Sequence, residues 1–261
     1  MENKGIPSLS TIINGETGHP ALLVHDLNAS LNDWEALIPD LVDAGYVTYA
    51  CDLFGHGHSP YPSDPQQYHA QLHLTAVRRW IDELNLVRAP ILIGHGFGAY
   101  LCLRYALGHP YRVFKLVLIN PLLSPEQISP FVRGLNRYAW LRKVTGLLAP
   151  DWTRRHLLGI HAGCQADLVQ RVLAEARQAS PNNQRILSGI SDLTTGLGDL
   201  PTRSLYLLGQ DDPLLDMDMI RELVEDHQDV TCICLPGLGH RPHLEAPRET
   251  NKLIVNFLLG I

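Results

Sequence analysis

The feature that most constrains this chain is the glycine-rich segment Gly94–Gly98, with the sequence GHGFG. It follows the apolar run Pro90–Ile93 and precedes a helical pattern over Ala99–Leu107, which predicts a strand, a sharp turn and a helix. In that context the pattern G-x-S-x-G presents a serine on a strained turn. The small residues two before and two after the apex let strand and helix approach closely. Here the apex is Gly96, so the chain has the frame of a nucleophile elbow without the nucleophile.

Strand-like runs alternate with helical stretches along the chain. The strands are expected at Leu9–Asn14, Ala21–His25, Val47–Asp52, Ile91–His95, Lys115–Asn120, Ser204–Leu208 and Thr231–Leu235. The helices are expected near Asn32–Ala44, Gln67–Leu86, Phe97–Gly108, Met217–Glu225 and Pro247–Leu259. This alternation predicts an α/β fold with a mostly parallel, doubly wound sheet and helices on both faces.

The alternation stops between Ser124 and about Leu200, where helical patterns and prolines replace strands. We therefore expect a core formed by residues 1–123 and 200–261 and a helical cap inserted at residues 124–199. Such a cap would lie over the carboxyl ends of the strands, where open α/β sheets bind ligands.

Composition narrows the functional classes. The chain has 261 residues, 45% of them hydrophobic and 18% charged, which is typical of an ordinary globular protein. Its net charge of -6 argues against a nucleic-acid partner. The amino terminus has no apolar signal core and no run approaches membrane-spanning length, so we expect a cytoplasmic protein without a membrane partner.

The cysteines do not predict a disulfide framework, because there are five and they are spread widely. Cys232 and Cys234 alternate within a predicted strand, so they are expected to face the same side of the sheet. We expect reduced thiols whose role is packing.

Four segments besides the elbow follow one another in a recognisable order along the chain. They are Ala21–Ser30, the glycine-rich loop Leu53–Ser59 after a strand, Gly209–Pro213, and Gly237–Glu245 near the carboxyl terminus. Together with the elbow they resemble the α/β-hydrolase superfamily, in particular its cap-bearing esterases and carbon–carbon hydrolases. The resemblance extends from about His25 to Leu259. It implies the chain order elbow, acid, histidine.

The resemblance implies a catalytic constellation of Gly96 (a vacant nucleophile position), Asp212 and His240. His240 follows a strand and a Gly-x-Gly turn, where an imidazole can move a proton near neutral pH. Asp212 would orient that ring. Asp211 is the competing acid, and an Asp-Pro turn before Pro213 would explain Asp212 structurally.

By the same resemblance, the backbone N–H groups of Leu27 and Phe97 would form an oxyanion hole, which binds negative charge as it develops. The family usually has His-Gly before this point, whereas this chain has His25 and Asp26. We expect the Asp26 side chain to point to solvent. His25, Phe97 and Trp140 are expected to contact substrate.

Other aromatic and aliphatic cap residues accompany Trp140 and indicate a small-molecule substrate with an apolar group. They are Leu141, Leu147, Leu148 and Trp152. Core packing explains these residues equally well. The loop Gly55–Ser59 is expected to be structural, and its two histidines lack a third metal ligand at a sensible spacing. We expect no metal and no cofactor.

The neighbours of the apex favour serine as the missing nucleophile. Aspartate-nucleophile relatives usually carry Trp after the apex, whereas this chain has Phe97. Glycine removes the strain of a non-glycine residue at positive φ and is expected to leave room for a water near His240. Gly96→Ser is therefore expected to restore ester hydrolysis at a cost of about 1 kcal/mol in stability.

Three functional classes stay open. The first is a hydrolase scaffold for a small ester, thioester, lactone or carbon–carbon bond, impaired in covalent catalysis by Gly96. The second is a nucleophile-free enzyme of lyase or cofactor-independent oxygenase type, in which His240 and Asp212 act as a general base. The third is a non-catalytic protein that binds a small ligand under the cap. The sequence does not give the oligomeric state.

Overall fold

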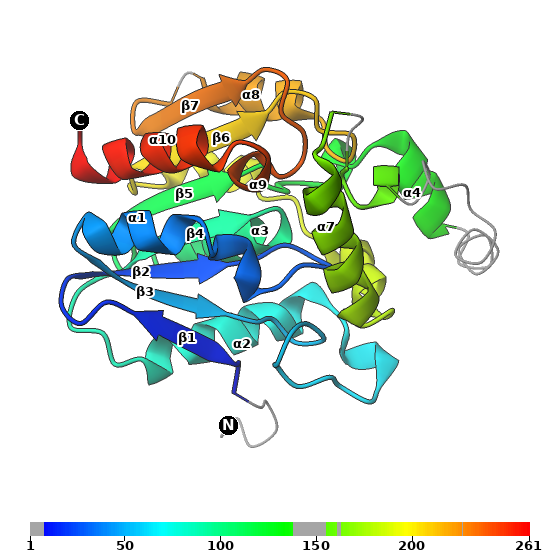
Figure 1. Ribbon diagram of the computed structural model, residues 1–261, viewed down its shortest axis with the longest axis horizontal. Helices are drawn as coiled ribbons and strands as arrows, with labels where there is room; N and C mark the ends of the chain where they lie inside the picture. Colours follow the sequence, from blue (N-terminus) through cyan, green and yellow to red (C-terminus); the bar gives the residue numbers. More distant parts are fainter. Residues whose placement is uncertain (1–7, 138–154, 161–162, 226) are drawn as a thin grey trace.

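One seven-stranded sheet forms the centre of the molecule (Figure 1). The structure is a computed structural model and describes residues 8–137, 155–160, 163–225 and 227–261. The strands are β1 (Thr11–Asn14), β2 (His19–Val24), β3 (Tyr46–Cys51), β4 (Ile91–His95), β5 (Lys115–Ile119), β6 (Ser204–Gly209) and β7 (Val230–Leu235). Their order is β1-β3-β2-β4-β5-β6-β7. β1 is antiparallel to β3, and every other neighbouring pair is parallel.

Helices cover both faces of the sheet (Figure 1). One face carries α1 (Leu37–Asp43) and α10 (Pro247–Leu259), and the other carries α2 (Ala70–Glu83), α3 (Phe97–Gly108) and α8 (Met217–Val224). Alternate residues of one strand enter the two cores: Leu23 of β2 packs on the α1 and α10 side, and Leu22 on the other. This alternation follows from the two-residue period of a strand whose two faces are both buried.

The predicted fold class is confirmed, and all seven expected strands are present, with ends shifted by no more than two residues. Two predicted helices are shorter than expected. The stretch near Asn32–Ala44 divides into a 3-10 helix (Leu31–Trp34), capped by the Ser30 side chain, and α1. The stretch near Gln67–Leu86 divides into a 3-10 helix (Pro65–Gln67) and α2, which begins after the capping residue His69.

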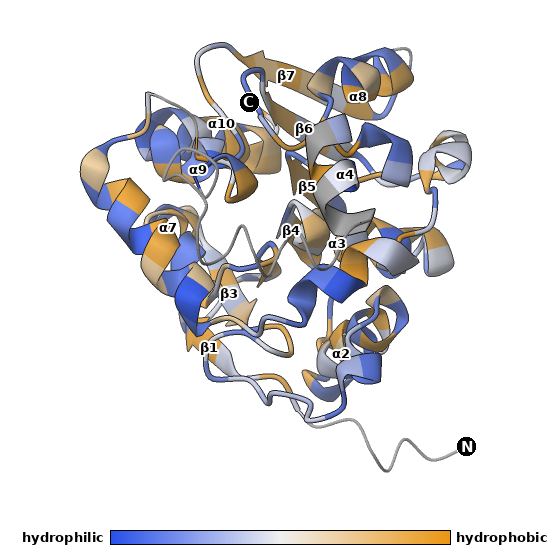
Figure 2. Cartoon of the chain, turned by 90° about the vertical axis from the view of Figure 1, so that its right-hand side faces the viewer, coloured by the Kyte–Doolittle hydropathy of each residue, from blue (hydrophilic) through white to orange (hydrophobic). Residues whose placement is uncertain are grey.

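The predicted cap region contains the 3-10 turn Pro125–Gln127, α4 (Pro130–Arg137), α7 (Ala166–Gln178) and two 3-10 helices (Asn183–Gly189 and Thr194–Asp199). The Thr194–Asp199 helix lies against the end of α3, where Gly196 faces Leu107. Helices α4 and α7 lie at the carboxyl ends of the strands (Figure 1). Figure 2 views the molecule from this end, with α4 and α7 on the viewer's side of the sheet. The described part of residues 124–199 contains no strand, and the exact limits of a cap stay a prediction.

Hydrogen bonds fasten the segment that follows α7 to the loop after β3. The Tyr61 hydroxyl donates to the Gln178 carbonyl at 3.0 Å, and the Ser180 N–H donates to the Gly55 carbonyl at 2.8 Å. A short helix, α9 (Pro242–Glu245), precedes α10 and follows the predicted histidine. None of the helices in the described ranges has both the length and the apolar content that crossing a membrane requires.

Candidate active site

The elbow between β4 and α3 has the backbone geometry that its glycines predicted. Gly96 adopts φ 52° and ψ -114°, a positive φ that favours glycine. A Cβ at Gly98 would lie 2.1 Å from the Val24 carbonyl oxygen, and one at Gly94 would lie 2.6 Å from the Ala99 backbone. Both flanking glycines are therefore required by the close approach of α3 to the sheet.

The Asp26 carboxylate fills the space above Gly96. A Cβ at Gly96 would lie 2.2 Å from Asp26 Oδ1 and 2.3 Å from its Cγ. The Phe97 N–H, the predicted oxyanion donor, donates to Asp26 Oδ1 at 2.6 Å. The expectation that Asp26 points to solvent was wrong, because the carboxylate finds a hydrogen-bond donor and a cationic partner inside. The expected room for a water above Gly96 is likewise taken by this carboxylate.

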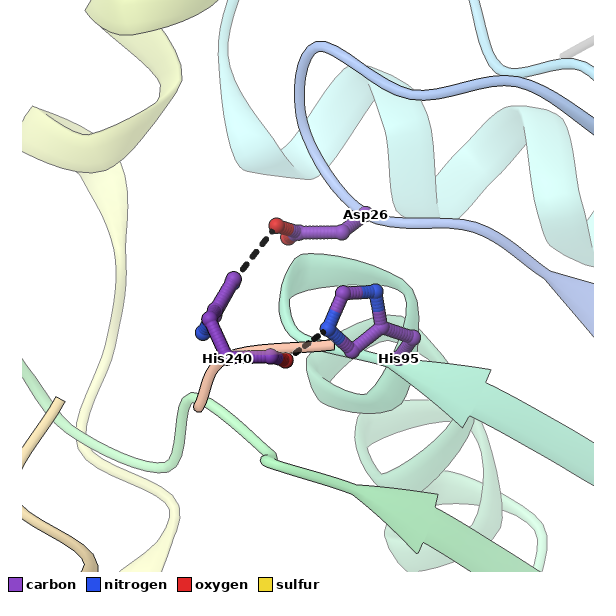
Figure 3. Close-up of side chains that lie close together, drawn as sticks. All are labelled: Asp26, His95 and His240. Carbon is purple, nitrogen blue, oxygen red and sulfur yellow. Dashed lines mark hydrogen bonds and ion pairs between the residues drawn. The ribbon is translucent and has the colours of Figure 1, made fainter. Parts of the chain in front are cut away.

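His240 lies between two carboxylates. Its Nδ1–H donates to Asp212 Oδ2 at 2.7 Å, and its Nε2–H donates to Asp26 Oδ2 at 3.0 Å. Figure 3 shows Asp26 and the His240 ring facing each other, with His95 bonded to the His240 carbonyl. The structure thus brings His240, Asp212 and Gly96 together as predicted, with Asp26 as an unexpected fourth member.

The choice between the two neighbouring aspartates follows from their positions after β6. Asp211 is exposed, whereas the Asp212 side chain is fully buried against His240. Asp212 Oδ1 accepts from the backbone N–H groups of Leu214 (2.7 Å) and Leu215 (3.2 Å). Asp212 is therefore the acid that orients His240.

The carboxylates determine the charge of the ring. Burial opposes the charged form of His240, but Asp212 and Asp26 outweigh it and raise the pKa of His240 to about 10. Burial would also raise the pKa of both carboxyl groups, yet the nearby His240 charge and hydrogen bonds hold the pKa of Asp26 and of Asp212 below their usual range. At neutral pH the site is a carboxylate–imidazolium–carboxylate row.

His25 does not contact the pocket, so its predicted role in substrate binding was wrong. The residue is fully buried, and its ring joins two backbone segments. Nδ1–H donates to the Asp26 carbonyl at 2.6 Å, and Nε2 accepts the Leu53 N–H at 3.0 Å. His25 thereby fixes the backbone of the residue whose side chain enters the site.

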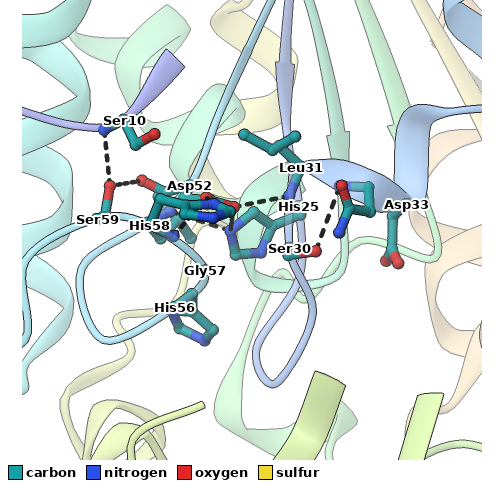
Figure 4. Close-up of polar contacts among 12 residues, drawn as sticks. Ser10, His25, Ser30, Leu31, Asp33, Asp52, His56, Gly57, His58 and Ser59 are labelled. Atoms are coloured by element: carbon teal, nitrogen blue, oxygen red, sulfur yellow. Dashed lines mark hydrogen bonds and ion pairs between the residues drawn. The ribbon is translucent and has the colours of Figure 1, made fainter. Parts of the chain in front are cut away.

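Asp52, directly after β3, connects the loop that follows β2 with the loop that follows β3 (Figure 4). Its side chain accepts from the Leu31 N–H and from the His58 N–H, each at 2.8 Å. His56 accepts the Asn28 N–H at 3.1 Å through Nε2. The loop Gly55–Ser59 is thus structural in geometry, as its sequence indicated.

A small pocket of about 90 Å³ opens beside the row of charges. It is lined mostly by apolar side chains. The lining residues are Asp26, Leu27, Asn28, Gly96, Phe97, Leu122, Ile128, Val132, Leu157, Leu158, Leu187, Leu214, Leu215, His240 and Arg241. Leu27 and Phe97 lie where the oxyanion prediction put them, and the role of the Leu27 N–H stays a prediction. Trp140 lies outside the described residues, as do Leu141, Leu147, Leu148 and Trp152.

Comparison with known proteins assigns the family. The model of the alpha/beta hydrolase family matches residues 21–253. The chain belongs to the α/β-hydrolase family.

Individual relatives agree with this assignment. The chain is 28% identical over 254 residues to the carbamate hydrolase candidate RutD of Variovorax paradoxus (strain S110), covering 94% of this chain and 93% of RutD. It is 26% identical over 259 residues to the 2-hydroxymuconate semialdehyde hydrolase of Pseudomonas sp. (strain CF600), covering 92% and 87%. The fold is similar to that of olei00960, a hydrolase from Oleispira antarctica, with a TM-score of 0.82, 17% identity, and coverage of 96% and 94%.

Two groups of described residues place three ligand-type atoms within 4.8 Å of one another. In the first, Asp26, His95 and His240, the charged His240 ring has no free lone pair for a metal. With His240 protonated, this first group has only two ligand-type residues left for a metal.

The second group is Asp33, His95 and His243, all of which are buried. Within the described part of the chain, no hydrogen-bond partner is found for His95 Nδ1, for either ring nitrogen of His243 or for Asp33 Oδ1. The Arg241 guanidinium, however, lies 3.3 Å from Asp33 Oδ2. A cation already stands beside the carboxylate that a metal would need.

Two positioning residues escaped the sequence interpretation. Asn120 donates through Nδ2 to Asp212 Oδ2 at 2.7 Å, and its Oδ1 accepts the Gly209 N–H at 2.8 Å. Glu245 accepts from Gly239 N–H at 2.7 Å and from Arg241 N–H at 3.0 Å, on either side of His240. Asn120 was predictable in part, since an amide at the end of β5 lies beside the carboxyl end of β6.

Proposed function

We propose that this chain hydrolyses a small, uncharged and largely apolar molecule in the pocket at the carboxyl ends of the strands. The observation that carries the proposal is the His240 ring, which Asp212 holds from one side and Asp26 from the other, and which lines a mostly apolar pocket together with Asp26. Membership of the α/β-hydrolase family and the hydrolase names of the relatives support the type of reaction.

A serine-type covalent step at residue 96 does not fit this site. Gly96 has no side chain, and the space that one would fill is occupied by Asp26. The Phe97 N–H is also engaged by Asp26, so a substrate carbonyl has to compete for it. The ester, thioester, lactone and carbon–carbon substrates expected from the sequence therefore require the carboxylate to move.

The general-base alternative has less support from the charge state of His240, whose Nε2 is bound to the Asp26 carboxylate. A base must be free to accept a proton at the working pH. The two carboxylates raise the pKa of His240 to about 10, so its ring is already protonated at neutral pH. In this state His240 is an acid.

Ligand binding without catalysis is a second candidate function. The observation in its favour is that Asp26 and His240 satisfy each other, which makes the polar end of the pocket self-contained. A pure binding protein would keep its affinity for an apolar ligand when His240 is replaced, because the lining that contacts the ligand is mostly aliphatic.

The test is a hydrolysis panel with 4-nitrophenyl acetate, 4-nitrophenyl butyrate, S-ethyl thiobutyrate, γ-butyrolactone and 1,2-epoxybutane. We expect turnover of at least one substrate, with a loss of at least about 100-fold in His240→Gln and in Asp212→Asn. Asp211→Asn is the matched control, since this neighbouring carboxyl is exposed, and we expect it to keep wild-type rates. Ligand binding by calorimetry together with no turnover of the panel would favour the binding function instead.

A further inference from the structure

The Asp26 carboxylate stands where the side chain of an elbow nucleophile would begin. Its Oδ1 and Cγ lie within 2.3 Å of the position that a Cβ at Gly96 would take. The carboxylate reaches this point from the loop after β2, a different strand from the one that carries the elbow. We propose that Asp26 is the nucleophile of this site and that it attacks a saturated carbon bearing an oxygen leaving group, as in an epoxide. This inference rests on the hydrolytic function proposed above.

The oxyanion donor indicates which electrophile the site accepts. The Phe97 N–H already binds Asp26 Oδ1 at 2.6 Å, so a substrate carbonyl would find this donor occupied. Attack on a saturated carbon develops no carbonyl oxyanion and needs no such donor. After the attack, Oδ1 becomes the carbonyl oxygen of the new ester and keeps its Phe97 hydrogen bond.

The proton on His240 completes the first step. Asp26 Oδ2 forms a bond to the epoxide carbon, and the carbon–oxygen bond of the ring breaks with its electron pair moving to oxygen. The Nε2–H of His240, 3.0 Å from Oδ2, is placed to protonate that oxygen. The products are a neutral imidazole and a hydroxyalkyl ester of Asp26.

Hydrolysis of the ester restores the site. Alkylation removes the negative charge of Asp26, which is one of the causes of the raised pKa of His240, so the ring becomes a base. His240 takes a proton from water as hydroxide attacks Cγ, and the oxyanion develops on Oδ1 against the Phe97 N–H. The tetrahedral intermediate then collapses and expels the product alkoxide. The alkoxide takes the proton that the added hydroxyl group leaves on the Asp26 carboxyl group. The net reaction is epoxide plus water to diol, with Asp26 again ionised and His240 again protonated.

A nucleophilic role suits Asp26 better than a basic one. The hydrogen bond and charge of His240 outweigh burial and hold the pKa of Asp26 well below its usual range. Such a carboxylate retains a proton poorly, which weakens general-base catalysis, but it is ionised and available to attack at every working pH. The Asp26 side chain is 11% exposed and lines the pocket, so substrate can reach it.

The pocket restricts the substrate to a compact, uncharged molecule. Its volume is about 90 Å³, and Leu27, Phe97, Leu122 and Leu215 are among the apolar side chains that line it. An epoxide with a short alkyl chain places its apolar part against these residues and its oxygen next to His240. A substrate carboxylate would instead be repelled by Asp26.

The experiment is isotope transfer to Asp26 during turnover. The full-length protein is incubated with 1,2-epoxybutane in H2(18)O, and the digested chain is analysed by mass spectrometry with fragmentation that separates Asp26 from Asp33. We expect diol formation, 18O in the Asp26 carboxyl group and none in Asp33. Asp26→Asn is expected to lose at least 100-fold in epoxide turnover, and Asp211→Asn to be labelled at Asp26 like the wild type.

Several results would overturn the assignment, and they differ from failure of the proposed function. Epoxide or ester turnover without 18O in Asp26 means that water attacks substrate directly, so the nucleophile assignment fails and the hydrolytic function stands. Turnover retained in Asp26→Asn has the same meaning. Absence of turnover for every panel substrate, epoxide included, rejects both the function and the nucleophile.

Discussion

The two carboxylates that flank His240 have very different surroundings. Asp212 accepts four hydrogen bonds, from His240, from the Asn120 amide and from the backbone N–H groups of Leu214 and Leu215. Asp26 has two side-chain contacts, the Phe97 N–H and His240. The Asp212 side chain is fully buried, whereas that of Asp26 is 11% exposed and faces the pocket.

This difference in surroundings suits Asp212 to positioning His240 and Asp26 to reacting with substrate. A carboxylate with its lone pairs occupied by fixed donors orients and charges its histidine but has no freedom to attack. A carboxylate at a pocket wall, with fewer donors, can leave its ion pair when substrate arrives. Both aspartates form an ion pair with His240, but we assign them different roles. The difference follows from the number of other hydrogen-bond donors that each carboxylate has.

The variant with the largest expected effect tests whether the Asp26 side chain prevents a serine at position 96 from acting as a nucleophile. Asp26→Gly combined with Gly96→Ser should gain 4-nitrophenyl ester hydrolysis, because His240 and Asp212 are in place and the Phe97 N–H becomes free. Loss of a nucleophile alone typically costs roughly a millionfold, so we expect the double variant to exceed Gly96→Ser by at least about 1,000-fold. Steady-state rates and burst kinetics measure this difference.

The single variant Gly96→Ser corrects the expectation drawn from sequence. Its Cβ would lie 2.2 Å from Asp26 Oδ1, so we now expect it to be inactive on esters and less stable than wild type. Equal ester activity in the single and double variants would show that the Asp26 carboxylate leaves the space above Gly96 freely, and would contradict the expectation that it excludes a side chain there.

A second prediction compares the two aspartates through the titration of His240. The pKa of His240 is raised to about 10 by both, with Asp212 the larger contribution. Removal of an opposite charge at this range typically shifts a pKa by roughly 1–3 units, so Asp26→Asn and Asp212→Asn should each lower the pKa of His240. NMR of the labelled imidazole measures both values. An unchanged pKa in Asp26→Asn would mean that Asp26 and His240 are not paired in solution.

A third prediction concerns stability against pH. The pKa of His240 lies above its ordinary 6.5 in the folded state, so its stabilising effect is fully present below pH 6.5 and is lost as the pH rises towards about 10. The pKa values of Asp26 and Asp212 lie below 3.8, so their effect is present above pH 3.8 and is lost as the pH falls through the folded-state values.

Urea unfolding of wild type between pH 4 and pH 10.5 should therefore show stability that declines above pH 6.5. His240→Gln should lack the His240 component of that decline, and Asp211→Asn should follow wild type. An identical pH dependence in wild type and His240→Gln would contradict the charge state assigned to the ring.

The sequence predicted the frame of the site better than its contents. The glycines of the elbow could be interpreted because close backbone approach forbids a Cβ, which is a local constraint. The inward turn of Asp26 could not, because it depends on His240, which lies 214 residues away in the chain. His25 was misjudged for the same reason: its two backbone partners are fixed by how the loops after β2 and β3 pack together.

Asn120 provides the smallest test of the contrast, because it contacts Asp212 and the Gly239 carbonyl next to His240 but makes no hydrogen bond to Asp26. Its amide joins Asp212 Oδ2 to the Gly209 N–H, and its own φ is 39°. Asn120→Gly removes the amide while keeping a residue that tolerates this φ, so backbone strain does not add to the loss of the hydrogen bonds. The conformational entropy that glycine adds to the unfolded chain contributes to the loss as well. We expect a fall of roughly 1–3 kcal/mol in unfolding free energy, as for a buried partner left unsatisfied. The unfolding free energy of Asn120→Ala should fall further, because alanine at this φ adds backbone strain.

The pKa of His240 should change less in either variant than in Asp26→Asn, since no charge is removed. A larger pKa change in Asn120→Gly than in Asp26→Asn would show that Asp212, once released, leaves the ring, and that Asp26 alone cannot hold it.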